Sequence, residues 1–156
     1  MRIRQLYITL GALAGMLICA DQATKHWARL RLAPERHCAG VLLQIQHHNG
    51  FLYRLFQSGP IPVQKFFYVG VPTFALVLML LILIKLQDEK FVTSLALVFV
   101  LAGAVGNLMD RFVYGYVNDF VGVSGFGVRT FLNLADLWII LGLVLLSWPL
   151  VHTRKD

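Results

Sequence analysis

Residues 91–111 read FVTSLALVFVLAGAVGNLMDR, and this stretch decides the class of fold. It carries no charged side chain from Phe91 to Met109, and Asp110 and Arg111 follow directly. An α-helix needs roughly 20 mostly apolar residues to cross about 30 Å of hydrocarbon. We therefore predict a membrane-spanning helix over about residues 91–110, with ionisable side chains at its end.

Three other uncharged stretches flank this one, at Gln5–Ala20, Phe66–Ile84 and Leu137–His152. With 58% hydrophobic and only 14% charged residues among 156, the chain is too apolar for an ordinary water-soluble domain. We predict an all-α membrane protein with four transmembrane helices, forming a single domain over residues 1–156. The expected spans are about 5–26, 66–86, 91–110 and 134–152.

The first loop between spans carries a strand pattern. Residues 41–46 alternate, Asn49-Gly50 is a strong hairpin signal, and a second apolar run follows over 51–56. We therefore predict a small extracytoplasmic β element over about residues 38–58.

Four spans place both termini on one side of the membrane. The region of the first outer loop carries as many basic residues as the terminal segments and the 85–90 segment together. We therefore rely on those short segments, where the positive-inside tendency acts best, and expect cytoplasmic termini. With that orientation the acids beside the spans all reach the outer face. These acids are Asp21, Asp110, Asp119 and Asp136.

Ionisable groups in or beside a span are costly to insert, so each one needs a reason. Asn107, Asp110 and Arg111 share one helix face by their i, i+3 and i+4 spacing, and Asp21 and Lys25 are four residues apart. These charges can support a reaction site, or they can be structural ion pairs and interfacial anchors only. The spacing leaves both interpretations open.

Asp119 and Asp136 differ from the other acids, because no basic residue lies within four positions of either. Two close carboxylates in a low-dielectric site repel each other when both are ionised, so one holds a proton near neutral pH. A carboxylate base beside a carboxylic acid can hydrolyse a peptide bond with an activated water. We therefore predict that this pair is catalytic.

Four segments together resemble the lipoprotein signal peptidases, also called signal peptidase II, in order and approximate spacing. They are residues 21–25 (DQATK), 103–111 (GAVGNLMDR), 117–120 (VNDF) and 133–136 (NLAD). The resemblance implies a membrane aspartic endopeptidase of the bacterial inner membrane. It would remove the signal peptide from diacylglyceryl-modified prolipoproteins, cleaving before the lipidated Cys.

The resemblance also implies roles for individual residues. Asp119 and Asp136 match the catalytic pair. Asn107, Arg111 and Asn133 match supporting residues, and Asp21, Lys25 and Asp110 match motif positions with a mainly structural role. The partners implied are the prolipoprotein, membrane lipids and globomycin-type inhibitory cyclic peptides. No cofactor, metal or nucleic acid is expected, and the oligomeric state is open with a monomer as the expectation.

The first outer loop departs from the family pattern of Asn-x-Gly followed by small residues. Asn49 matches the family Asn if one residue is deleted, and His48 occupies that place without a gap. Bulky side chains follow at Phe51, Leu52 and Tyr53 in either alignment. We therefore hypothesise an active peptidase with an altered substrate preference.

Three competing functions stay open from the sequence. A non-catalytic homologue that binds lipoproteins is compatible with the altered outer loop. A small ion- or proton-coupled transporter would place its acids nearer mid-depth than this chain does. A zinc site would have to use His37, Cys38, His47 and His48, whose spacing matches no recognised zinc motif.

Overall fold

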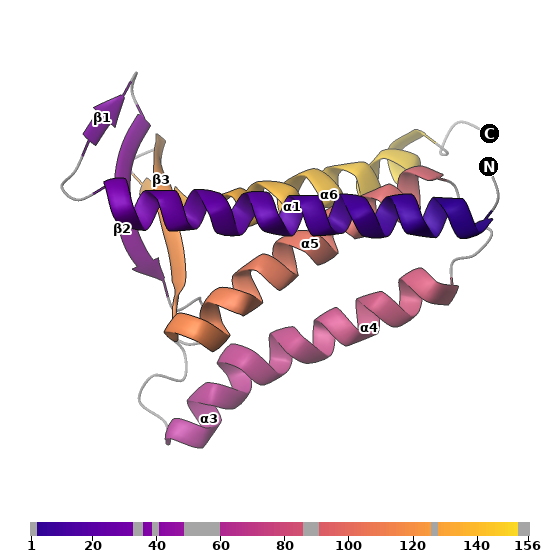
Figure 1. Cartoon of the computed structure of the whole chain (residues 1–156), viewed down its shortest axis with the longest axis horizontal. Coiled ribbons are helices and arrows are strands. Elements are labelled where there is room, and N and C mark those ends of the chain that lie inside the picture. The colour runs from indigo at the N-terminus through magenta and orange to yellow at the C-terminus, as the bar shows by residue number, and fades with distance from the viewer. Residues whose placement is uncertain are drawn as a thin grey trace.

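The structure is a computed structural model that describes residues 3–32, 36–38, 41–48, 60–85, 91–125 and 128–152. Long helices run roughly lengthwise, and a small curved sheet lies across one end of them (Figure 1). Helix α1 begins and α6 ends at the end of the bundle opposite the sheet. The mostly helical architecture expected from the sequence is therefore confirmed.

Four helical segments account for the apolar stretches. They are α1 (Ile3–Arg31), the run of α3 (Ile61–Lys65), η1 (Phe66–Gly70, a π-helical turn) and α4 (Val71–Lys85), then α5 (Phe91–Tyr114) and α6 (Leu134–His152). Within the described residues, three helical segments are long and apolar enough to cross a membrane, namely Gln5–Arg31, Ile61–Ile82 and Phe91–Tyr114. The apolar part of α6, Leu134–Trp148, is shorter, so a fourth span stays a prediction.

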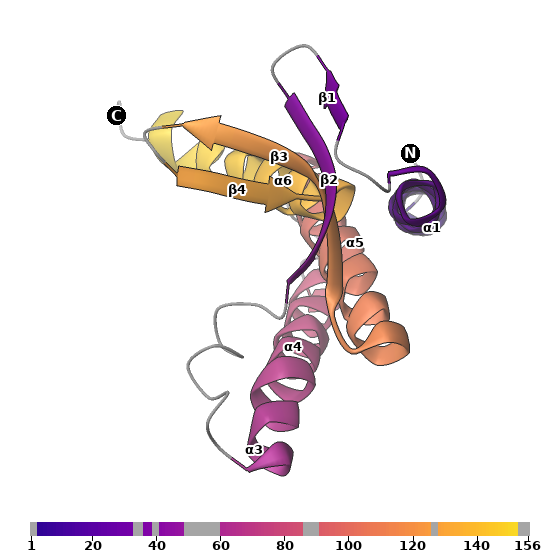
Figure 2. The same ribbon diagram turned by 90° about the vertical axis from the view of Figure 1, so that its left-hand side faces the viewer.

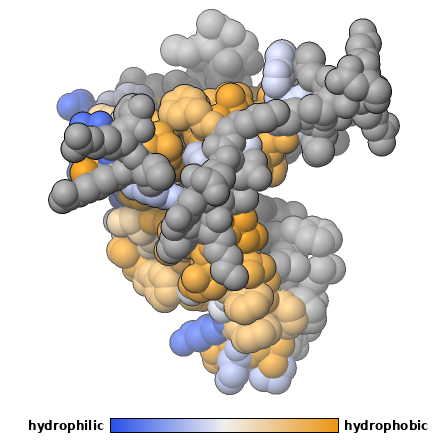
Figure 3. All heavy atoms as spheres, turned by 90° about the vertical axis from the view of Figure 1, so that its right-hand side faces the viewer, coloured by the Kyte–Doolittle hydropathy of each residue, from blue (hydrophilic) through white to orange (hydrophobic). Residues whose placement is uncertain are grey.

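Helix α5 is the centre of the bundle and contacts α1, α4 and α6. Its buried face carries small and medium apolar residues such as Ala96, Val98 and Ala102, and Leu10 and Leu17 of α1 pack against the latter two in one core cluster. The outer faces of the helices keep large apolar side chains exposed, among them Ile8, Phe74 and Leu81. Apolar residues dominate the coloured surface seen from the end where α1 begins (Figure 3). Such a surface suits contact with lipid.

The sheet is larger than the sequence predicted. It has four antiparallel strands in the order β1 (Arg36–Cys38), β2 (Val41–His48), β3 (Val117–Gly125) and β4 (Val128–Leu132). Strand β2 confirms the strand expected over 41–46, while the turn at Asn49-Gly50 and residues 51–56 lie outside the described residues. Strands β3 and β4 were not expected. Strand β3 pairs with β2, which is far away in sequence, and β4 then pairs with β3.

The sheet is held over the end of the bundle by a second core. Ala28 and Leu32, at the end of α1, pack with Phe120 of β3, and Ile45 and Val121 pack against them. Seen end-on, β3 and β4 extend over α6 while β1 and β2 lie toward α1 (Figure 2). Strand β3 therefore passes across the tops of the helices and brings Asp119 to them.

Candidate active site

Asp136 lies in the first turn of α6, where it forms a capping box with Asn133. The Asn133 side chain accepts a hydrogen bond from the Asp136 backbone N–H (3.0 Å), and the Asp136 carboxylate accepts one from the Asn133 backbone N–H (3.1 Å). The two residues thereby satisfy two N–H groups that a helix start leaves without partners. This reciprocal pair fixes one Asp136 oxygen at the start of α6.

Asp119 lies on β3, opposite Gln46 of β2, and only 4% of its surface is exposed. Its carboxylate accepts a hydrogen bond of 2.6 Å from the side-chain amide of Asn133. The same amide nitrogen lies 3.1 Å from the side-chain oxygen of Asn107. Asn133 therefore contacts both of the acids that the sequence singled out.

Asn107 completes the surroundings of Asp136 from α5. Its side-chain nitrogen donates to the second Asp136 oxygen at 2.8 Å. Both oxygens of Asp136 therefore accept an N–H hydrogen bond, which favours the ionised carboxylate. Among the described residues, the Asp119 carboxylate accepts such a bond only from Asn133.

The pKa of Asp119 is raised from 3.8 to about 7. Burial is the largest cause, because desolvation penalises the charged form, and the negative charge of Asp136 is the second. The hydrogen bond from Asn133 and the charge of Lys25 act in the opposite direction. At neutral pH Asp119 is therefore poised between its acid and carboxylate forms.

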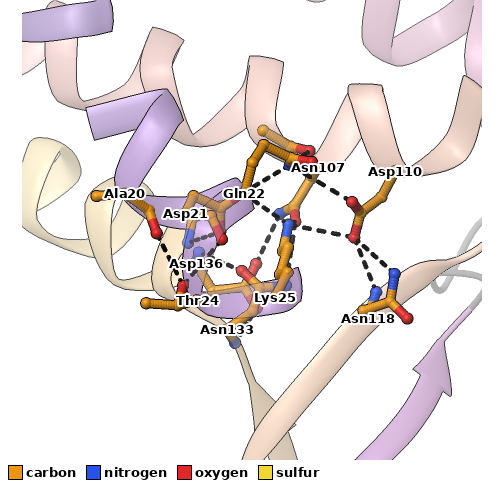
Figure 4. A network of polar contacts seen from close by, with 12 residues as sticks. Ala20, Asp21, Gln22, Thr24, Lys25, Asn107, Asp110, Asn118, Asn133 and Asp136 are labelled. Carbon is orange, nitrogen blue, oxygen red and sulfur yellow. Dashed lines mark hydrogen bonds and ion pairs between the residues drawn. The ribbon is translucent and has the colours of Figure 1, made fainter. Parts of the chain in front are cut away.

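Close to Asp136 lies a buried charged cluster of Asp21, Lys25 and Asp110, all with no exposed surface (Figure 4). The Lys25 ammonium is 2.9 Å from an Asp21 oxygen and 3.3 Å from an Asp110 oxygen, and it donates to the Asn107 side-chain oxygen at 3.0 Å. Gln22 donates to both Asp21 and Asp110. The sequence paired Asp21 with Lys25, but it did not predict that Asp110 pairs with Lys25 rather than with its neighbour Arg111.

Arg111 is partly buried on the other side of the site. Its guanidinium lies 5.5 Å from the ring centroid of Tyr68, and it interacts electrostatically with Asp136 and Asp119. Arg111 and Tyr68 line a cavity of about 630 Å³ between the α3–η1 segment and the end of α5. Arg111 therefore stands between this mostly apolar cavity and the two acids.

The described site brings together eight of the nine residues named from the sequence, which come from α1, α5, β3 and the start of α6. The ninth, Asn49, lies outside the described residues. Two contributors were missed, Gln22 and Asn118, although both stand inside the motif segments 21–25 and 117–120. Asn118 is buried and donates to Asp110 through its backbone and side-chain nitrogens.

No group of three or more His, Cys, Asp or Glu side chains in the described part of the chain could hold a metal ion. The side chains of the alternative zinc ligands His37, Cys38, His47 and His48 lie outside that description.

Comparisons with known proteins agree on one family. A sequence model of the family described as signal peptidase (SPase) II matches residues 13–152. A lipoprotein signal peptidase of Teredinibacter turnerae is 33% identical over 145 residues, covering 90% of this chain and 85% of the relative. A lipoprotein signal peptidase of Dichelobacter nodosus is 31% identical over 143 residues, covering 86% and 88%.

Two solved bacterial membrane enzymes share the fold. One has a TM-score of 0.72 and 20% identity, with 95% of this chain and 92% of the other covered. The second has a TM-score of 0.66 and 23% identity, with 95% and 94% covered. At these identities the likeness concerns the fold.

Proposed function

The chain belongs to the signal peptidase II family, and from this premise we propose that it is a membrane aspartic endopeptidase. It removes the signal peptide from diacylglyceryl-modified prolipoproteins and cleaves before the lipidated Cys. The observation that most supports the aspartic mechanism is the position of Asn133, which binds Asp119 through its side chain and Asp136 through its backbone. Two acids from different elements thereby accept hydrogen bonds from one buried residue, Asn133.

We assign the base to Asp136 and the acid to Asp119. Asp136 carries two N–H hydrogen bonds that stabilise its charge, while the pKa of Asp119, about 7, leaves it able to carry a proton. Asp136 takes a proton from water as the water oxygen bonds to the scissile carbonyl carbon, and Asp119 protonates the carbonyl oxygen. Asp136 then protonates the leaving nitrogen as the C–N bond breaks, and Asp119 recovers a proton from the hydrated carbonyl.

We further propose that the acids lie near the outer membrane surface, with both termini in the cytoplasm and α6 as the fourth span. This placement fits the position of the sheet at one end of the helices, with the start of α1 and the end of α6 at the other. A substrate held by its own lipid would keep its scissile bond near that surface. Membrane lipids would surround the exposed apolar helix faces.

The test is cleavage of a purified diacylglyceryl prolipoprotein, with the product identified by mass spectrometry. The parent protein should release the signal peptide before the lipidated Cys, and Asp119→Asn and Asp136→Asn should lose this activity while remaining folded and inserted. Binding of the precursor without cleavage would favour the non-catalytic homologue. Proton flux in proteoliposomes without cleavage would favour the transporter.

Two finer proposals accompany this function. Globomycin-type cyclic peptides should inhibit cleavage, as the family resemblance implies, and the protein should act as a monomer. The divergent segment 47–54 should alter which prolipoproteins are preferred. Equal processing of a panel of prolipoproteins with different lipobox residues would contradict that preference.

A further inference from the structure

We propose that Lys25 is a positioning residue that sets the arrangement of both acids from beneath the site. This inference rests on the proposed function, since it concerns the same pair. Lys25 is fully buried and touches neither acid directly in the hydrogen bonds and ion pairs of the described residues. It acts through three arms, which are Asp21, Asp110 and Asn107.

The first arm reaches the start of α6. Asp21 pairs with Lys25 at 2.9 Å, and its other oxygen accepts the Ala135 backbone N–H at 2.9 Å. Ala135 directly precedes Asp136 and has no exposed surface. A carboxylate bound to free N–H groups at a helix start is favourable, because it meets the positive end of the helix dipole. Asp21 thereby anchors the turn that carries Asp136 to α1.

The second arm reaches β3 in the same way. Asp110 pairs with Lys25 at 3.3 Å, and the same oxygen accepts the Asn118 backbone N–H at 3.0 Å and the Asn118 side-chain nitrogen at 3.2 Å. Asn118 directly precedes Asp119. One ammonium group therefore holds two carboxylates, and each of them holds the residue just before one of the acids (Figure 4).

The third arm fixes the direction of an amide. An ammonium group has only donors, so the Asn107 atom that faces Lys25 at 3.0 Å must be the oxygen. The nitrogen of that amide then points to Asp136, where it donates at 2.8 Å. Without the ammonium, a half-turn of the amide would place its oxygen against the Asp136 carboxylate. Lys25, together with the Asn133 amide that donates to the same oxygen at 3.1 Å, therefore keeps a donor facing the proposed base.

Gly106 shows how tightly this arrangement is fitted. A Cβ atom on Gly106 would lie 2.5 Å from the Asp21 oxygen that pairs with Lys25 and 3.1 Å from its carboxyl carbon. Only a glycine at this position lets α5 approach the cluster so closely. Gly106→Ala should displace the Asp21 carboxylate and loosen its hold on Ala135 without removing any charge.

The test measures kcat and KM for cleavage of the lipidated precursor in detergent or vesicles. Gly106→Ala should lower kcat about 10-fold or more with KM little changed. The matched control is Gly11→Ala, the same substitution on α1 at a glycine whose Cβ would meet nothing within 4 Å. That variant should keep the parent kcat. A folded Gly106→Ala protein with the parent kcat would overturn the first arm.

A double-mutant cycle tests the third arm. The charge-balanced variant Lys25→Met/Asp110→Asn and the variant Asn107→Ala should each lower kcat at least 10-fold. Their combination should lower it by less than the product of the two losses, because the part of the Lys25 effect that passes through Asn107 is already lost. Losses that simply multiply would show that Lys25 does not act through Asn107 and would overturn the third arm. If the charge-balanced variant does not insert, the kcat of Gly106→Ala, which removes no charge, still tests whether the Asp21 arm positions the start of α6.

Failure of this inference is distinguishable from failure of the proposed function. If the parent cleaves the precursor and Asp119→Asn and Asp136→Asn do not, the function stands. Unchanged kcat in all the Lys25, Asn107 and Gly106 variants would then contradict the positioning role alone.

Discussion

The two acids of the site lie on different kinds of backbone. Asp136 stands in the first turn of a helix, where a capping box and the Asn107 amide supply hydrogen bonds to both its oxygens. Asp119 stands on strand β3, two residues after its start, with 4% of its surface exposed and one described side-chain donor. A helix start stabilises negative charge, whereas a buried strand position does not. Two residues of the same type are thereby prepared for opposite roles.

Among the variants that test this comparison, Asn133→Ala should lower kcat the most, because it removes the side chain that contacts both Asp119 and Asp136. The variant loses the amide donor to Asp119 and half of the capping box of Asp136. We expect kcat to fall about 1,000-fold, and the melting temperature to fall with the lost cap, worth about 1 kcal/mol. Thr9→Ala is the control, because the exposed Thr9 hydroxyl donates to the Gln5 carbonyl oxygen one turn earlier on α1. If Asn133→Ala kept the kcat of the parent protein, Asn133 would not be needed to support the two acids.

The two acids should also differ in how they affect the stability of the folded protein at different pH. The folded protein binds the Asp119 proton more tightly than the unfolded chain, since its pKa is about 7 rather than 3.8. The free energy of unfolding should therefore fall as pH rises from about 4 to about 7 and stay low above that range. Asp119→Asn should be more stable than the parent at pH 8 by a few kcal/mol, with the difference vanishing near pH 4.

The control for that prediction is Asp136→Asn. An Asn at position 136 has only one oxygen to accept the two N–H bonds that the carboxylate now takes. We expect it to gain nothing at pH 8. Thermal unfolding of the parent and both variants across this pH range measures the difference, and equal stabilisation by the two variants would contradict it.

The pH dependence of cleavage should follow the acid. If Asp119 must be protonated, kcat/KM should decline about tenfold per pH unit above about 7, as the protonated fraction declines. Asp110 adds to the raised pKa of Asp119 by its charge, so Asp110→Asn should move this decline to lower pH. Initial rates of precursor cleavage, measured in buffers from pH 5 to pH 9, give the pH profile. A rate that rises through pH 7 to 9 would reverse the assigned roles.

The smallest fall in kcat is expected from a change at the turn between α5 and β3. The Tyr68 hydroxyl donates to the carbonyl oxygen of Gly115, which has a φ of 79° and ends α5 just before β3. Tyr68→Phe removes that hydrogen bond but keeps the ring beside Arg111. We expect kcat to fall only a few-fold, since one hydrogen bond is worth about 1 kcal/mol. Tyr7→Phe, at an exposed hydroxyl remote from the site, should have no effect.

The same difference between the acids explains what the sequence could predict. The segment 133–136 is local, because Asn133 and Asp136 meet across one helical turn, and an Asn-x-x-Asp pattern before an apolar run is readable as a cap. Asp119 was identified because no basic residue lies within four positions of it, and by the family resemblance. Its strand forms by pairing with β2, whose Gln46 lies opposite it, and no local pattern in 117–120 indicates that partner.

The charged cluster shows the same limit. Helical spacing predicted the contact between Asp21 and Lys25, which are four residues apart on one helix. It could not predict that Lys25 reaches Asp110 and Asn107, because those contacts depend on how α1 packs against α5. The apolar stretches predicted the helices well for the opposite reason, since a span depends on composition alone.

The most direct test of the assignment of Asp119 as acid and Asp136 as base is a carboxyl titration of the folded protein. The Asp side chains are labelled with carbon-13 and followed by NMR or infrared spectroscopy. We predict one carboxyl that titrates near pH 7, is missing in Asp119→Asn, and moves to lower pH in Asp136→Asn because a neighbouring negative charge is gone. A parent protein with no carboxyl titrating near neutral pH, or one whose signal survives Asp119→Asn, would contradict the account.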